Sequence, residues 1–221
     1  MDRREEVKRR MLVAGAMAAT LAFLALAGVA AHGQIWGIDE SVRALAHRVQ
    51  YPALGMGMQA VSILGDPTGL VPMIVVISGV LWRSRRRYAL LVPLVMIGTG
   101  LLQAVTKWAV ARPRPNLAPW GYPSGHVLSL VVLLGLVCYL IVLSGPRRSW
   151  RYLSAAGSAI VLLAVAASRL YLEAHWLSDV VGGFAVGLAY LLVVILMMEA
   201  YRRTAYSPPP ASPALVVSPQ N

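Results

Sequence analysis

The chain has 221 residues, a length that suits a single domain. Hydrophobic residues make up 58% of the sequence and charged residues only 13%, whereas a soluble domain usually carries about 25% charged residues. This composition excludes an ordinary soluble protein and indicates a lipid bilayer as the solvent. The net charge of +11 would favour a nucleic-acid partner in a soluble protein, but here the basic residues lie mainly between apolar runs. We therefore expect them to orient the chain in a membrane, with no nucleic acid bound.

Six apolar segments predict membrane-spanning helices, which need about 20 residues to cross the hydrocarbon core. Five are long enough or nearly so, and the second is shorter, although Pro67 suits a first helical turn and Asp66 can cap it. The predicted fold is all-α, a six-transmembrane-helix bundle within residues 1–206. A proline-rich segment, 207–221, is predicted to be a disordered cytoplasmic tail. In chain order the six segments are 11–31, 67–82, 88–108, 127–144, 152–172 and 177–200.

Three further features of the sequence allow only a limited interpretation. The first segment follows a basic start and ends in small residues, so it also resembles a signal peptide, although it is long for one. Residues 32–66 form a predicted outer loop in which 39–50 have the apolar spacing of a helix lying on the membrane surface. Cys138 is the single cysteine and lies inside an apolar run, which predicts a packing role and excludes an intrachain disulfide.

The basic residues predict the orientation of the bundle. Fourteen of the 20 lie in four segments that fall on one side if all six runs span the membrane. The positive-inside rule places that side, with both termini, in the cytoplasm. The agreement also supports the short second span, because the alternation of sides fails without it. These segments are 3–10, 83–87, 147–151 and 202–203.

Ionisable residues also gather at span ends on the opposite, outer side. A single Lys or Arg there is well explained by snorkelling to lipid headgroups. Several cations together with two histidines and one acid at the same face favour a functional site instead. The set comprises Lys107, Arg112, Arg114, His126, Arg169, His175 and Asp179.

The cations in this set suit a phosphate ligand. Lys107, Arg114 and Arg169 supply positive charge, and arginine forks match phosphate oxygens. Ser124 and Gly125 precede the fourth span, where the free N–H groups of a helix start favour an anion. Taken alone, this segment also fits a simple helix cap.

The two histidines suit different steps of a phosphoryl transfer. His175 and Asp179 are four residues apart, so a helix would place the carboxylate against one imidazole nitrogen and activate the other as a nucleophile. Alone, the pair also fits a structural contact at a helix start. His126 could then act as general acid for the leaving oxygen. We expect no metal, because the nearby acids are only Asp179 and Glu173 and the cations would repel one.

Three motifs occur in order: Lys107 with Arg114-Pro115, then Pro123-Ser124-Gly125-His126, then Ser168-Arg169 with His175 and Asp179. Together they resemble the three-part signature of the type 2 phosphatidic acid phosphatase superfamily, which also includes bacterial undecaprenyl diphosphate phosphatases and soluble vanadium haloperoxidases. The resemblance implies a six-helix bundle with its site at the outer membrane face. It also implies a phosphohistidine mechanism that needs neither a metal nor another cofactor.

Carried onto this sequence, the resemblance makes His175 the nucleophile, Asp179 its orienting partner and His126 the general acid. The phosphoryl oxygens would be held by Lys107, Arg114, Ser124, Gly125 and Arg169. Two residues stand outside the signature. Arg112 is an extra cation, and Glu173 occupies a position where many relatives have a small residue, so it either contacts the leaving group or headgroup or faces solvent.

The predicted function is hydrolysis of a lipid phosphate or diphosphate within the membrane. A phosphotransferase would use the same site with another acceptor. A lipid transporter is disfavoured because transport sites lie near the midplane, and because Gly183 and Gly187 suit helix packing better than a pore. Undecaprenyl diphosphate, phosphatidic acid, phosphatidylglycerol phosphate and diacylglycerol diphosphate all remain possible substrates, and the oligomeric state is not defined.

Overall fold

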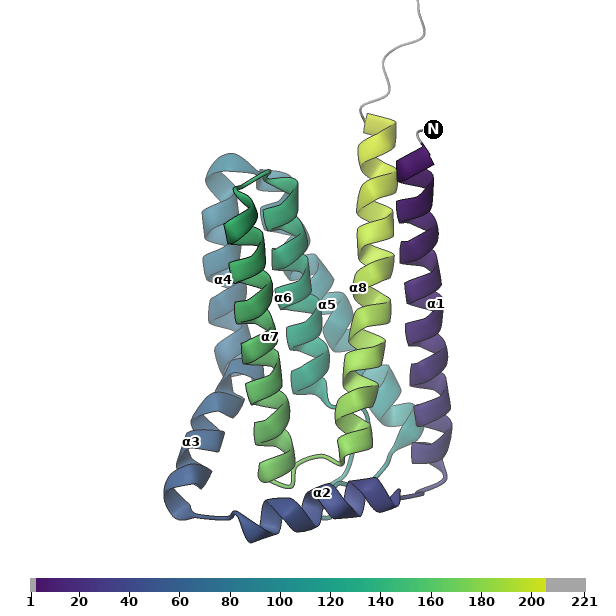
Figure 1. Ribbon diagram of the computed structural model, residues 1–221, viewed down its shortest axis with the longest axis vertical. Helices are drawn as coiled ribbons and strands as arrows, with labels where there is room; N and C mark the ends of the chain where they lie inside the picture. Colours follow the sequence, from purple (N-terminus) through teal and green to yellow (C-terminus); the bar gives the residue numbers. More distant parts are fainter. Residues whose placement is uncertain (1–2, 206–221) are drawn as a thin grey trace, which may run out of the picture.

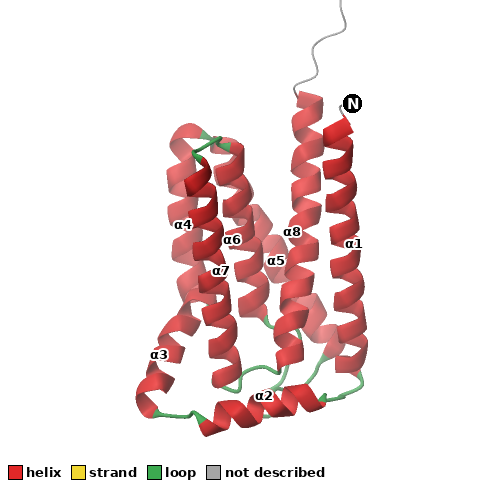
Figure 2. Cartoon of the chain, in the orientation of Figure 1, coloured by secondary structure: helices red, strands yellow, loops and turns green. Residues whose placement is uncertain are grey.

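The computed structural model describes residues 3–205, and every regular element in that range is helical (Figures 1 and 2). The predicted tail, 207–221, lies outside the described residues. The elements in chain order are α1 (Arg3–Ala31), α2 (Gly37–Arg48), α3 (Pro52–Ser62), the short 3-10 helix η1 (Ile63–Gly65), α4 (Pro67–Ser84), α5 (Arg86–Val110), α6 (Gly125–Leu143), α7 (Arg148–Tyr171) and α8 (Leu177–Ala205).

Six of these helices are long and apolar enough to cross a membrane: α1, α4, α5, α6, α7 and α8. The prediction of six spans is therefore confirmed, including the short second one. Most of these helices expose large apolar side chains on their outer faces, as a bilayer solvent allows. Charged residues extend α1 back to Arg3 and α8 forward to Ala205, because a helix can continue beyond the hydrocarbon core.

Helix α6 forms the centre of the bundle. Its buried apolar residues run from Val127 to Leu140, and it packs against α5, α7 and α8. Helices α1 and α8 run side by side next to the group formed by α4–α7 (Figure 1). Cys138 of α6 is partly buried with its Sγ 3.3 Å from the hydroxyl oxygen of Ser158, in keeping with a packing role.

Two glycines allow α8 to approach α6 closely. A Cβ atom at Gly183 would lie 2.5 Å from the carbonyl oxygen of Ser124, and one at Gly187 would lie 3.0 Å from that of Leu128. Any side chain at Gly183 would therefore push the two helices apart. The predicted packing role of the Gly183 and Gly187 pair is confirmed.

The segment expected to be a loop, 32–66, is largely helical. The surface helix predicted at 39–50 is present as α2, which lies across one end of the bundle (Figure 1). It is followed by α3 and η1, which the sequence analysis did not predict. Pro52 occupies the first turn of α3, and the helix packs against α7 rather than extending into solvent.

The connections divide between the two ends of the molecule. The N-terminal part of α1, the end of α8 and the α4–α5 and α6–α7 connections lie at one end, which gathers the four basic segments (Figure 1). The α5–α6 and α7–α8 connections lie at the other end, beside α2. The signature residues fall at this second end.

Candidate active site

The predicted site residues come from the ends of four helices. Lys107 lies in the last turn of α5 and Arg169 in the last turn of α7. Ser124 is the N-cap residue of α6, followed by Gly125 and His126. His175 precedes α8 and Asp179 lies in its first turn, while Arg114 lies in the α5–α6 connection. The structure thus brings all eight to one end of the bundle.

His175 and Asp179 form a buried pair. Their side chains are 2% and 0% exposed, and His175 Nδ1 lies 3.6 Å from Asp179 Oδ2, longer than a hydrogen bond. The other contact of this oxygen is with the backbone N–H of Trp176, which donates to it over 2.9 Å. Asp179 therefore also fixes the start of α8, as an acid in the first turn commonly does.

Burial lowers the pKa of His175 to about 4. The nearby carboxylate of Asp179 opposes this shift in pKa, and the positive charges of Arg169 and Lys107 add to it. The imidazole is therefore neutral at physiological pH and keeps a free lone pair. A neutral ring beside fixed cations has the ionisation state that a nucleophile toward phosphorus needs.

Several donors near this histidine are buried without a hydrogen-bond partner among residues 3–205. Three of them are the Nε atoms of Arg114 and Arg169 and the hydroxyl of Ser124, and Arg112 Nε also lacks a partner. Buried donors without partners are rare in folded proteins and call for an explanation. An anion with several oxygens would satisfy all three, and phosphate fits both the charge and the geometry of the arginines.

Two other donors of these cations have protein partners. Lys107 Nζ donates to the carbonyl oxygen of Trp120 over 2.7 Å, and Arg169 Nη1 donates to the Ser62 hydroxyl over 2.6 Å. Electrostatic interactions link Lys107 with Arg114, Arg169 and Asp179. These bonds hold the flexible side chains in place, so their positive charges converge on one region.

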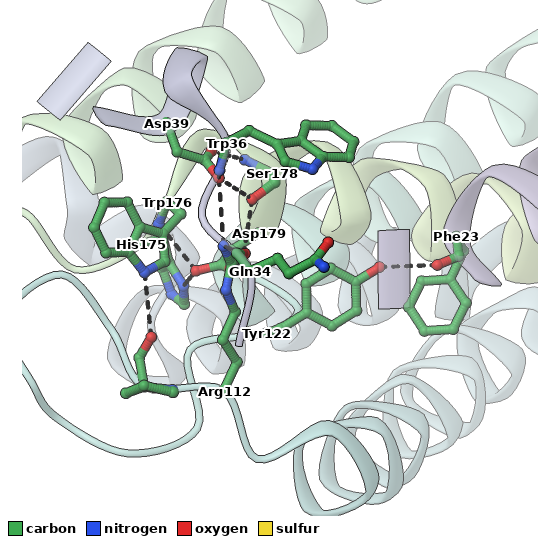
Figure 3. A network of polar contacts seen from close by, with 11 residues as sticks. Phe23, Gln34, Trp36, Asp39, Arg112, Tyr122, His175, Trp176, Ser178 and Asp179 are labelled. Carbon is green, nitrogen blue, oxygen red and sulfur yellow. Dashed lines mark hydrogen bonds and ion pairs between the residues drawn. The ribbon is translucent and has the colours of Figure 1, made fainter. Parts of the chain in front are cut away.

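Arg112 has a larger role than an extra cation beside a motif. Its side chain is 2% exposed, and Nη1 donates to Asp179 Oδ1 over 2.8 Å and to the Ser178 hydroxyl over 2.7 Å (Figure 3). Its Nη2 donates to the carbonyl oxygen of Gln34 over 2.7 Å and lies 3.3 Å from Asp39 Oδ2. The guanidinium therefore connects Asp179 directly to the α1–α2 region.

Asp39 completes this network from α2. Its carboxylate is 1% exposed and accepts bonds from the backbone N–H of Ser178 over 2.8 Å and from the Ser178 hydroxyl over 2.7 Å (Figure 3). The sequence analysis missed Asp39 and Ser178 as site residues. The available signal was an acid within the outer segment of a chain that has only nine acids.

Glu173 provides a second tie to α2. Its side chain is 14% exposed and lies 3.2 Å from Arg43 Nε and 2.8 Å from His47 Nε2. Of the two expectations for Glu173, contact with the leaving group or headgroup and exposure to solvent, the second is wrong. Its side chain contacts Arg43 and His47 of α2 and also Gln50. A small pocket beside His175 is lined by residues of α2 and of the α7–α8 connection, including Arg43, Glu173 and Trp176.

His126 lies across the site from this network. Its Nε2 is 3.2 Å from Asp66 Oδ1, although the contact lacks the geometry of a good hydrogen bond. Arg169 and His175 also act on it electrostatically. Within residues 3–205 no group of three or more His, Cys, Asp and Glu side chains is arranged to hold a metal ion.

These features define a class: a polytopic helical membrane protein with two histidines and an anion-binding set of cations at one end of the bundle. Residues 88–203 match the PAP2 superfamily, so the chain belongs to the PAP2 superfamily. Within that superfamily it is a membrane lipid phosphate phosphatase, a hydrolase.

Known relatives agree with this assignment. The chain is 30% identical over 194 residues to phosphatidylglycerophosphatase B of Bacillus subtilis (strain 168), covering 83% of this chain and 94% of the relative. It is 27% identical over 128 residues to lipid phosphate phosphatase delta of Arabidopsis thaliana, covering 50% of this chain and 31% of that protein. The crystal structure of a transmembrane PAP2-type phosphatidylglycerolphosphate phosphatase from Bacillus subtilis matches with a TM-score of 0.77 at 27% identity, covering 85% of this chain and 98% of the other.

Proposed function

We propose that this phosphatase removes the terminal phosphate of a membrane lipid at the extracytoplasmic face, through a phosphohistidine on His175. The observation that carries the proposal is the neutral, buried His175 beside Asp179, close to partnerless donors of Arg114, Arg169 and Ser124. Phosphatidylglycerol phosphate is the first substrate to test, because the Bacillus subtilis relatives are named for it.

In the first step, His175 attacks phosphorus through Nε2, the ring nitrogen not occupied by Asp179. The bond between phosphorus and the lipid oxygen breaks, and the oxygen takes the bonding electrons. His126 gives that oxygen a proton, so the lipid leaves as a neutral alcohol. Lys107, Arg114, Arg169 and the N–H groups at the start of α6 stabilise the charge on the three remaining phosphoryl oxygens.

In the second step, water attacks phosphorus while His126, now neutral, accepts a proton from it. The bond between phosphorus and His175 breaks, the imidazole recovers its lone pair, and phosphate is released. Asp179 holds the ring orientation through both steps, and Arg112 holds Asp179. No step in this scheme uses a metal ion.

The direct test is phosphate release from a panel of lipid phosphates and diphosphates in detergent, with a strong chelator present and no added acceptor. We expect release from phosphatidylglycerol phosphate, and an acid-labile, alkali-stable phosphoenzyme after rapid quenching. Transfer only when an acceptor lipid is added would favour the phosphotransferase. Complete loss with chelator, restored by magnesium or zinc, would contradict the metal-free chemistry.

The orientation has its own test. A cysteine introduced between Asn116 and Trp120, in a variant lacking Cys138, should react with an impermeant thiol reagent applied to intact cells. One introduced between Arg83 and Arg87 should react only after the cells are opened, because the basic segments favour the cytoplasm. The opposite labelling pattern would place the site in the cytoplasm.

A further inference from the structure

The carboxylate of Asp66 is directed at His126 rather than at its own helix. Asp66 is the N-cap residue of α4, with φ −80° and ψ 158°, a position where an aspartate usually accepts a bond from the second or third helical N–H. The expected side-chain cap is not formed. Oδ1 instead lies 3.2 Å from His126 Nε2. The sequence correctly located the helix start but assigned the wrong partner to this side chain.

The backbone around Asp66 is shaped to allow this contact. The carbonyl oxygen of Asp66 accepts bonds from the N–H groups of Gly69 over 3.0 Å and Leu70 over 2.8 Å, so the Gly69 N–H, which a capping carboxylate could accept, already has a partner. A Cβ atom at Gly65 would lie 2.8 Å from Cβ and Cδ2 of His126. Any other residue at this position would push η1 away from the ring, and the carboxylate with it.

The charges around His126 make this carboxylate important. Among the described residues, the charged or titratable groups acting on the ring are Asp66, Arg169 and His175, and Asp66 is the single acid. Its side chain is 43% exposed, whereas Asp179 is fully buried, so Asp66 contacts the histidine and is also partly accessible from outside.

From this arrangement we propose that Asp66 is the positioning residue of His126 and makes the enzyme prefer phosphomonoesters over diphosphates. The proposal rests on the proposed function, in which His126 protonates the leaving oxygen. With Nε2 facing the carboxylate at 3.2 Å, Nδ1 is the nitrogen that gives its proton to the lipid oxygen as the phosphorus–oxygen bond breaks. This is a second histidine–carboxylate pair, opposite to that of His175, which faces its carboxylate through Nδ1.

The preference follows from the charge of the leaving group. A phosphomonoester releases an alcohol, which is a poor leaving group and becomes neutral only if it receives the proton. A diphosphate releases a lipid monophosphate, which departs more readily without a proton and carries negative charge toward Asp66. The carboxylate therefore assists the first reaction and repels the product of the second.

The test compares Asp66→Asn with the wild-type enzyme on phosphatidic acid, farnesyl diphosphate and p-nitrophenyl phosphate in detergent. General acid catalysis contributes about 10²–10⁴-fold in rate. We expect kcat on phosphatidic acid to fall about tenfold or more with little change in KM, and kcat on p-nitrophenyl phosphate to stay within about twofold. The kcat/KM for the diphosphate should be unchanged or higher. Asp66→Ser, which keeps a good N-cap residue, should show the same split among substrates.

Two results would overturn the proposal: an equal loss on all three substrates, which is the mark of a structural defect, or no loss on any. In a His126→Ala background Asp66→Asn should have no further effect, and independent, additive losses would also refute the pairing. If the wild-type enzyme hydrolyses no lipid, the proposed function fails. The leaving-group prediction is then decided by phenyl phosphate against p-nitrophenyl phosphate, where Asp66→Asn should slow only the former.

Discussion

The two ends of the bundle differ in how deeply their most buried ion pair is placed. At the α2 end, the ion pair of Arg112 with Asp179 joins side chains that are 2% and 0% exposed. At the other end, Lys8 and Glu199 are 46% and 13% exposed, and Arg10 and Glu6 are 78% and 41% exposed. The pairs have similar lengths, 2.8, 2.7 and 2.6 Å, so burial and not contact distance separates them.

This difference reflects what each end has to do. Removing charges from water is costly, and the attraction within a buried pair often only offsets that cost. Such a pair is therefore a poor device for stability but a good one for fixing a carboxylate in one place. Exposed pairs cost little and contribute little. The comparison predicts large functional effects at the α2 end and small ones at the other.

The largest effect should come from His175→Ala. Without the imidazole no phosphoenzyme can form, so turnover should be abolished for lipid and for p-nitrophenyl phosphate alike. His126→Ala should lose most activity on a lipid phosphomonoester but retain a measurable share on p-nitrophenyl phosphate, whose leaving group needs no proton. Asp179→Asn should fall between the two. Phosphate release and trapped phosphoenzyme measure all three, and retained turnover in His175→Ala with loss in His126→Ala would reverse the assigned roles.

The next largest effect should come from Arg112→Ala. It leaves the carboxylates of Asp39 and Asp179 buried without their cation, a change that costs about 3–5 kcal/mol in other proteins. We expect a lower apparent melting temperature in detergent and a loss of about 10- to 100-fold in kcat. Arg112→Lys should recover part of the stability but less of the activity, since an ammonium cannot bridge both carboxylates as a fork does.

Asp39→Asn separates the loss of stability from the loss of activity. The amide still accepts a bond from Ser178, so the fold should be maintained better than in Arg112→Ala. A loss of kcat in Asp39→Asn, with KM nearly unchanged, would show that α2 acts on the chemistry through Arg112. Full activity in both variants would contradict a positioning role for the network.

The sequence predicted much more of the fold than of this polar network. Apolar length and basic segments together identify all six spans, because the bilayer constrains both features strongly. The motif residues were located correctly at one end, since each lies at the end of a predicted span. Helix α3 was missed because its sequence lacks the strong apolar periodicity of α2, and its contact with α7 is long-range.

The contacts that complete the site depend on tertiary structure alone. Arg112 and Asp39 are 73 residues apart, and no local pattern relates them. Asp66 precedes a proline at a helix start, and that sequence is the same whether the carboxylate caps the helix or contacts His126. Sequence motifs thus identify the groups that touch phosphate, whereas the groups that position them become visible only in the fold.

A smaller effect should appear in the pH dependence of stability. Burial lowers the pKa of His175 to about 4 from 6.5, so the folded state resists protonation that the unfolded chain accepts. The stability contributed by the neutral ring is therefore complete above pH 6.5 and is lost as the pH falls through about 4. As the pH falls from 7 to 4.5, the melting temperature of wild type should decrease relative to that of His175→Asn. A constant difference would mean that His175 titrates normally.

The smallest effect should come from Glu6→Gln at the opposite end. The pair of Glu6 with Arg10 spans one helical turn of α1, and its side chains are 41% and 78% exposed. Exposed pairs of this kind are worth about 0–1 kcal/mol, and salt screens them further. For Glu6→Gln we expect an unchanged kcat and a melting temperature within about 1 °C of wild type. Neither value should change between low and physiological ionic strength. Because Glu6→Gln removes one carboxylate from an ion pair just as Asp39→Asn does, it serves as the matched control. Loss of activity in Glu6→Gln equal to that in Asp39→Asn would mean that charge at either end matters alike, and the contrast between the two ends would not hold.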